Sequence, residues 1–136
     1  MLRSRQWYNA QKIKEFEQAF AAFQGARFGI AVCNGTASLE AALVCSGVGA
    51  GDEVIIPAYT FQATADAVLR ANGVPVFCDV ELDTFNLDVK AAAALVNEKT
   101  KAIIPVHWAG LPCDMDRIVE LAAGHGLVVV EDACHS

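Results

Sequence analysis

The sequence lacks the features that would place the protein on nucleic acid or in a membrane. Its ten basic residues are scattered and are outnumbered by sixteen acidic ones, which gives a net charge of -6. Because binding to a phosphate backbone needs clustered Lys and Arg, we expect no nucleic-acid partner. No apolar run approaches the roughly 20 residues of a membrane span, and charges throughout residues 1–28 are unlike a secretory signal. We therefore expect a cytoplasmic protein with no membrane partner.

Paired cysteines, metal-ligand spacings and a true dinucleotide loop are also missing. The five cysteines are odd in number, widely spaced and without a C-x-x-C pair, which favours buried thiols in a reducing compartment over a disulfide framework. The set His107, Cys113, Cys134 and His135 matches no zinc-ligand pattern, so we expect no metal. The glycines of residues 47–51 follow a helical pattern and precede a strand pattern, the reverse of the order that phosphate binding requires.

What the sequence does contain is a regular alternation of strand and helix patterns. An amphipathic helix over residues 11–24 comes first. Strands are predicted at residues 28–33, 53–56, 74–80, 102–107 and 127–131, and helices at residues 37–46, 61–72, 88–97 and 114–124. The strands are continuous apolar runs, which predicts burial on both faces in an α/β fold, a mostly parallel sheet flanked by helices. Asp88 and Asp114 stand where an N-cap carboxylate accepts backbone N–H bonds.

The pattern also suggests a domain organisation. Residues 1–27 are interpreted as an N-terminal helical segment, and residues 28–136 as the first part of a larger α/β domain. The chain ends at Ser136 immediately after a strand pattern, with no helix to cover it. We therefore expect the sequence to be a fragment of a longer product.

Polar, aromatic and glycine residues follow the predicted strands, at the edge where open α/β sheets bind their ligands. They lie at residues 34–38, 59–61, 107–110 and 131–136. Residues 34–38 lead into a helix whose first N–H groups and dipole can hold a phosphate without any lysine. Thr36 and Ser38 could add hydroxyl donors. The alternative, that Thr36 only caps its own helix, is equally open.

A carboxylate and an aromatic ring complete the candidate site. Asp132, beside Glu131, ends an apolar strand, and a desolvated acid needs a cation or hydrogen-bond donors. A protonated pyridine nitrogen is one such cation, whereas an N-cap or a metal-ligand role is the alternative. Phe61 offers a flat face for a planar ring, or it is a core aromatic. A hydrogen-bonded histidine inside a loop is the favoured interpretation of His107, and Trp108 could line the site.

Taken together, these segments resemble the nucleotide-sugar aminotransferases of the DegT/DnrJ type. The resemblance rests on residues 34–41, 51–57, 59–65, 83–88, 100–107 and 131–135, in the order and spacing of that family. Each segment alone is weak evidence for the family, but the set of segments in this order is specific for it. It covers the chain from about Phe16 to its end.

The resemblance implies the pyridoxal-phosphate (PLP) dependent aspartate-aminotransferase fold (type I), of which this chain would be part of the large domain, and a homodimer with its site at the subunit interface. The implied cofactor-binding residues are Gly35, Thr36 and Ala37 at the phosphate, Phe61 stacked on the ring, Asp132 at the ring nitrogen and His135 near the ring. Cys134 departs from the alanine that the family usually has at that position.

The implied reaction transfers an amino group from glutamate or glutamine to a nucleotide-linked keto sugar, in the biosynthesis of polysaccharide or antibiotic sugars. Asp132 is the implied catalytic residue of this chain. The family's Schiff-base lysine falls beyond Ser136, and no lysine of this chain stands at a strand end, so we expect the 136-residue chain alone to be inactive. Three alternatives stay open: a PLP-dependent sugar dehydratase of the same family, an inactive truncated homologue, and an unrelated nucleotide-binding domain.

Overall fold

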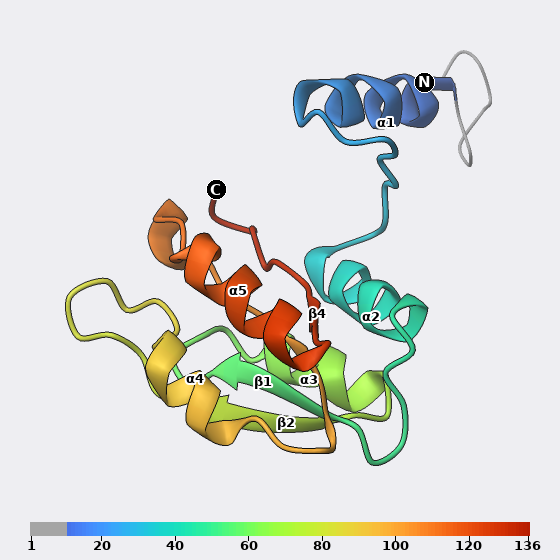
Figure 1. Cartoon of the computed structure of the whole chain (residues 1–136). Coiled ribbons are helices and arrows are strands. Elements are labelled where there is room, and N and C mark those ends of the chain that lie inside the picture. Colours follow the sequence, from blue (N-terminus) through green and yellow to red (C-terminus); the bar gives the residue numbers. More distant parts are fainter. Residues whose placement is uncertain (1–10) are drawn as a thin grey trace. The chain divides into compact units, whose positions relative to one another are not determined.

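The computed structural model describes residues 11–136, which belong to two compact units divided between Cys33 and Asn34 (Figure 1). The described part of the first unit contains α1 (Gln11–Phe23), as its three- and four-residue apolar spacing predicts. Phe16 and Phe20 stack on each other with their ring centroids 5.6 Å apart. Gly25 ends this helix with φ +63, a backbone conformation that glycine adopts without strain.

The strand predicted at residues 28–33 is wrong, because this segment pairs with no strand in the described part of the chain. Its Ala31 N–H is instead bonded by the Glu17 carboxylate at 2.8 Å. Phe28 and Ile30 are largely exposed. Apolar and β-branched residues favour a strand only where a sheet edge is present to receive it. The domain boundary proposed at residue 28 stays a prediction.

The second unit is built on a four-stranded sheet with the strand order β2-β1-β3-β4. Its strands are β1 (Glu53–Pro57), β2 (Val74–Cys78), β3 (Thr100–Ile103) and β4 (Val128–Val129). Every neighbouring pair is parallel. The mostly parallel sheet predicted from the sequence is confirmed, and all its carboxyl ends therefore meet at one edge.

Helices cover both faces of this sheet (Figure 1). They are α2 (Gly35–Cys45), α3 (Ala63–Arg70), α4 (Val89–Leu95) and α5 (Met115–His125). Val54 and Ile56 of β1 pack into the core with α2 and α3, whereas Ile55 packs into the core with α4 and α5. All three side chains are fully buried. A strand buried on both faces must be apolar at every position, which explains the apolar run of β1. The predicted burial on both faces is wrong for the edge strand β2, where Val74 and Phe77 are 47% and 57% exposed.

The ends of the elements follow local chemistry. Asp88 and Asp114 cap α4 and α5 through their carboxylates, as predicted. The strand predicted at residues 102–107 begins earlier, at Thr100, and ends at Ile103. It ends there because Pro105 has no N–H to donate to the neighbouring strand. Parallel pairing nevertheless resumes at a bridge between Val106 and Asp132. Within residues 11–136, every helix falls short of the length and apolarity needed to cross a membrane.

Candidate active site

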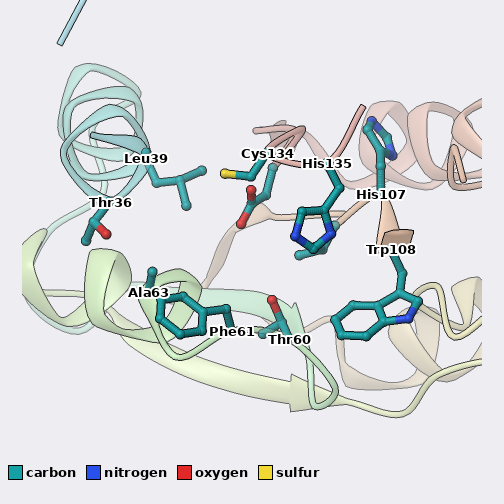
Figure 2. Close-up of a pocket in the computed structure, with 12 residues that line it drawn as sticks. Thr36, Leu39, Thr60, Phe61, Ala63, His107, Trp108, Cys134 and His135 are labelled. Carbon is teal, nitrogen blue, oxygen red and sulfur yellow. The ribbon is translucent and has the colours of Figure 1, made fainter. Parts of the chain in front are cut away.

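A cavity of about 130 Å³ lies at the carboxyl edge of the sheet (Figure 2). The first turn of α2 and the segments that follow β1, β3 and β4 line it. The lining residues are Gly35, Thr36, Leu39, Thr60, Phe61, Ala63, Val106, His107, Trp108, Asp132, Cys134 and His135. Parallel strands bring these segments together from positions up to a hundred residues apart in the sequence. The structure therefore brings residues from all four predicted edge segments, among them Thr36, Phe61 and Asp132, around one cavity.

The first turn of α2 forms one wall of the cavity. Asn34 caps this helix, since its Oδ1 accepts the Ala37 N–H at 2.9 Å. The alternative in which Thr36 is the cap is therefore wrong. The N–H groups of Gly35 and Thr36 have no acceptor within the helix, as in the first turn of any helix. Ala37 does not line the cavity, and its N–H donates to Asn34 Oδ1.

Gly35 is packed against the segment that follows β4. A Cβ atom added at Gly35 would lie 3.1 Å from Cys134 Sγ, closer than ordinary van der Waals contact. The missing side chain therefore lets the helix N-terminus approach Asp132 and Cys134 at the cavity. A side chain at Gly35, the first residue of α2, would require Cys134 to shift by a few tenths of an ångström.

Asp132 is a buried carboxylate with a defined donor. It is 7% exposed, and Thr64 Oγ1 donates to its Oδ2 at 2.9 Å. Thr60 Oγ1 lies 2.9 Å from the same threonine hydroxyl. A hydrogen bond with Asp132, aided by burial, raises the pKa of the Cys134 thiol to about 11. The thiol is thus protonated at neutral pH and can donate to the carboxylate.

Aromatic side chains surround the opening. Phe61 lines the cavity and is 74% exposed, so its interpretation as a core aromatic is wrong. Tyr59 lies beside it in sequence but packs on Trp108, with ring centroids 4.4 Å apart. Trp108 in turn meets the His135 ring edge-on at 6.1 Å. Phe61 is thus left with a free face at the cavity, while the other rings support one another.

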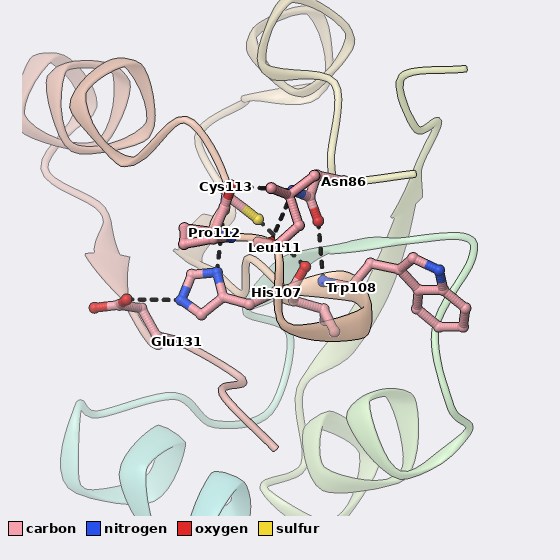
Figure 3. A network of polar contacts seen from close by, with 8 residues as sticks. Asn86, His107, Trp108, Leu111, Pro112, Cys113 and Glu131 are labelled. Carbon is pink, nitrogen blue, oxygen red and sulfur yellow. Dashed lines mark hydrogen bonds and ion pairs between the residues drawn. The ribbon is translucent and has the colours of Figure 1, made fainter. Parts of the chain in front are cut away.

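His107 is hydrogen-bonded on both ring nitrogens (Figure 3). The Cys113 N–H donates to Nδ1 at 3.2 Å, so neutral His107 carries its proton on Nε2 and donates to Glu131 Oε2 at 2.9 Å. The ring is 5% exposed. His107 is therefore a buried, hydrogen-bonded loop histidine, the interpretation favoured from the sequence.

The match of the chain to known sequences decides its family. The sequence profile of the DegT/DnrJ/EryC1/StrS aminotransferase family matches residues 1–136. The chain belongs to this family.

Relatives within the DegT/DnrJ/EryC1/StrS family are similar over nearly the whole chain. The spore coat polysaccharide biosynthesis protein SpsC of Bacillus subtilis is 46% identical over 125 residues, which are 92% of this chain and 32% of the relative. GDP-perosamine synthase of Caulobacter vibrioides is 48% identical over 124 residues, 91% of this chain and 33% of the relative. The chain thus spans about a third of the length of the curated relatives it matches.

A solved structure has the same fold over nearly the whole of this chain. The crystal structure of NtdA from Bacillus subtilis, with bound cofactor PMP, superimposes with a TM-score of 0.96 and is 35% identical. The match covers 98% of this chain and 31% of that one. The four-stranded sheet with helices on both faces is therefore part of the aminotransferase fold.

No role at the site was predicted from the sequence for two side chains, Thr64 and Asn86. Thr64 stands in the predicted helix, four residues after Thr60, which precedes that helix, and the two hydroxyls lie 2.9 Å apart. Asn86 carries no local signal, although it makes three hydrogen bonds to the segment after β3. Lys90, Lys99 and Lys101 of the second unit do not line the cavity.

Proposed function

We propose that the cavity is the PLP site of an enzyme that transfers an amino group to a nucleotide-linked keto sugar. The observation that carries this proposal is the combination, around one cavity, of a helix N-terminus, a buried carboxylate and an exposed aromatic ring. Each group suits a different part of a phosphorylated pyridine: the helix N-terminus suits the phosphate, the aromatic ring suits the pyridine face, and the carboxylate suits the ring nitrogen.

The residues present fit such a cofactor. The N–H groups of Gly35 and Thr36 and the dipole of α2 supply positive potential for a phosphate without a basic side chain. Asp132 is buried, yet its only donors from side chains in the described residues are hydroxyl and thiol groups. A cationic ring nitrogen would give this carboxylate the opposite charge that a buried acid favours.

The roles proposed for the chain's own side chains follow from these positions. Gly35 and Thr36 would hold the phosphate, with Ala37 contributing to the same helix turn, and Phe61 would cover the ring by stacking. Asp132 would keep a proton on the ring nitrogen, and Thr64 would hold that carboxylate in place. PLP, when bound, supplies an electron-withdrawing ring that stabilises negative charge at the reacting carbon. His135 would lie near the same ring.

The proposed substrates rest on the relatives. GDP-perosamine synthase is named for a nucleotide-linked amino sugar, and the Bacillus relative for a coat polysaccharide. The first name supports a nucleotide-linked sugar as acceptor and the second supports polysaccharide biosynthesis. The keto group of the acceptor and glutamate or glutamine as donor are proposed from the family resemblance. We also propose a cytoplasmic homodimer, and the 74% exposure of Phe61 supports a further surface that covers the cavity.

We propose further that the 136-residue chain alone performs no transamination. Covalent capture of the cofactor by an amine requires a lysine within reach of the cavity. The three lysines of the second unit lie outside the cavity lining. A lysine from another part of the protein or from a partner would have to complete the site.

The test compares Asp132→Asn with Asp116→Asn, a matched change of an exposed acid on α5, in the complete gene product. Unmodified protein should carry the visible absorbance band of PLP and aminate the cofactor with glutamate or glutamine. Loss of a buried charge partner costs about 3–5 kcal/mol, so Asp132→Asn should retain some cofactor but slow amination by two orders of magnitude or more. Asp116→Asn should behave as the unmodified protein does.

Near-normal amination by Asp132→Asn would refute the role of this carboxylate. Absence of the PLP band from unmodified protein saturated with the cofactor would refute the cofactor site itself. Both measurements use the same preparations, so the two failures are distinguishable.

A further inference from the structure

A buried amide holds the turn that follows β3 (Figure 3). Asn86 Nδ2 donates to the carbonyl oxygens of Leu111 at 3.1 Å and Pro112 at 3.2 Å. Its Oδ1 accepts the Trp108 N–H at 3.0 Å. One side chain thus bonds both ends of the turn from a position more than twenty residues earlier. Asn86 is 4% exposed, so water cannot readily replace these bonds.

The backbone on both sides of this contact is strained. Within residues 11–136, three residues other than glycine have positive φ: Asn72, Phe85 and Ala109. Asn72 tolerates this region, whereas a bulky residue such as Phe85, at φ +58, rarely occupies it. Phe85 immediately precedes Asn86, and Ala109, at φ +50, lies within the turn that Asn86 holds. Such conformations persist only where surrounding contacts determine them.

The turn carries two parts of the cavity wall. Trp108 lines the cavity directly and packs on Tyr59. The His107 N–H donates to the Asp132 carbonyl oxygen at 3.1 Å, which ties the segment of the buried carboxylate to the same turn. A displacement of the turn would therefore move the aromatic wall and the acid together.

We propose that Asn86 is a positioning residue for the cavity: its amide fixes the turn of residues 107–112, and through it the Trp108 ring and the backbone of Asp132. Asn86 does not line the cavity, so it would act through the turn. Its effect on cofactor binding rests on the proposed PLP site, whereas its effect on Trp108 does not.

The experiment uses the complete gene product labelled with 5-fluorotryptophan, in which the Trp108 fluorine resonance is identified by its loss in Trp108→Phe. Asn86→Ala should shift and broaden that resonance in the cofactor-free protein. In a PLP titration followed by visible absorbance, it should weaken binding by about 10- to 100-fold, the affinity equivalent of leaving buried hydrogen-bonding groups unsatisfied.

Asn97→Ala is the matched control. Asn97 also donates twice through Nδ2, to Glu53 Oε2 and the Leu95 carbonyl oxygen, and accepts the Lys99 N–H through Oδ1. These contacts lie at the amino end of β1 and are exposed, so this variant should change neither the Trp108 resonance nor PLP affinity. A purely general effect of losing a bonded asparagine would appear in both variants.

Asn86→Asp tests the hydrogen bonds of Asn86 separately from its packing, because the side chain keeps nearly the same size and shape. It retains the acceptor for Trp108 but replaces the two donated hydrogens by a carboxylate facing two carbonyl oxygens. This variant should also move the resonance and weaken PLP binding, and it serves as the test if Asn86→Ala does not fold.

An unmoved Trp108 resonance in a folded Asn86 variant would overturn the proposal, as would a moved resonance with unchanged PLP affinity. If unmodified protein fails to bind PLP, the proposed cofactor site fails, and the fluorine resonance still decides whether Asn86 positions the turn.

Discussion

The two ends of the sheet are held by similar side-chain contacts, but they differ in burial. At the amino ends, Asn97 Nδ2 donates to Glu53 Oε2 at 2.7 Å on the exposed surface. At the carboxyl ends, Thr64 bonds Asp132 and Asn86 bonds the turn of residues 107–112, and all three of these side chains are buried.

This difference shows what the buried polar groups are for. A buried polar group must find partners or it destabilises the fold. The amino ends of the same strands are closed without such groups, so closing a sheet end does not require them. Their concentration at the carboxyl ends is explained by the need to fix the geometry of a cavity. Three predictions test this contrast, using the apolar centre of the sheet as the reference.

The largest loss of stability is expected from a substitution at the apolar centre of the sheet. Ile103 lies in β3 and is fully buried in the core with α4 and α5. Ile103→Ala should lower the free energy of unfolding by about 2–5 kcal/mol, because it removes buried methyl groups and leaves a cavity. Urea denaturation of the complete gene product measures this change. Leu82→Ala, at a 92% exposed side chain, should leave the midpoint unchanged, and equal effects of the two variants would contradict the assigned core.

The second effect concerns Cys134 at the carboxyl end. Its pKa is raised from 9.0 to about 11, chiefly by the hydrogen bond with Asp132. Because the thiolate is the reactive form, iodoacetamide at neutral pH should modify Cys134 about 100-fold more slowly than an unperturbed cysteine. The same raised pKa means that the contact stabilises the fold up to about pH 9, and that this contribution is lost as the pH rises through 11.

Asp132→Asn should accelerate the modification of Cys134, since it removes the main cause of the raised pKa. Exposed Cys45 on α2 provides an internal reference within the same molecule. Mass spectrometry of the peptides gives both rates. An unchanged Cys134 rate in Asp132→Asn would show that the carboxylate does not control this thiol.

The smallest effect is the difference between two threonines. Thr64→Val keeps the shape of a fully buried side chain but leaves a carboxylate oxygen of Asp132 without its donor, which costs about 1–3 kcal/mol. Thr100→Val at the amino end removes a hydroxyl that accepts the exposed Asn97 N–H and should cost less. Denaturation midpoints of the two variants compare the sheet ends directly, and a larger loss for Thr100→Val would reverse the contrast drawn above.

Much of the second unit could be predicted from the sequence because its signals are local. Continuous apolar runs located the strands, and Asp88 and Asp114 marked the starts of two helices through bonds within four residues. Parallel pairing then required the carboxyl ends to share one edge, so the gathering of Thr36, Phe61 and Asp132 followed from topology. Their chemical roles remain proposals.

The contacts that could not be predicted join distant parts of the chain. Thr64 and Asp132 are 68 residues apart, and Asn86 and Trp108 are 22 apart. No periodicity in the sequence encodes such a pairing, because it depends on how the loops settle on the finished sheet. The error at residues 28–33 has the same origin: a local preference for a strand does not say whether the segment pairs with a sheet, and this segment pairs with none in the described part of the chain.

Gly110 is a position of the sequence where other amino acids are not tolerated. It has φ +85, and a Cβ atom there would lie 2.8 Å from the carbonyl oxygen of His135. Any other amino acid at this position would have to push the His135 backbone away. Substitutions of Gly110 should therefore be selected against as strongly as substitutions of a ligand-binding residue, although Gly110 has no side chain that could contact a ligand. A survey of functional variants of the gene would find position 110 nearly invariant, because of both the limited space and the positive φ.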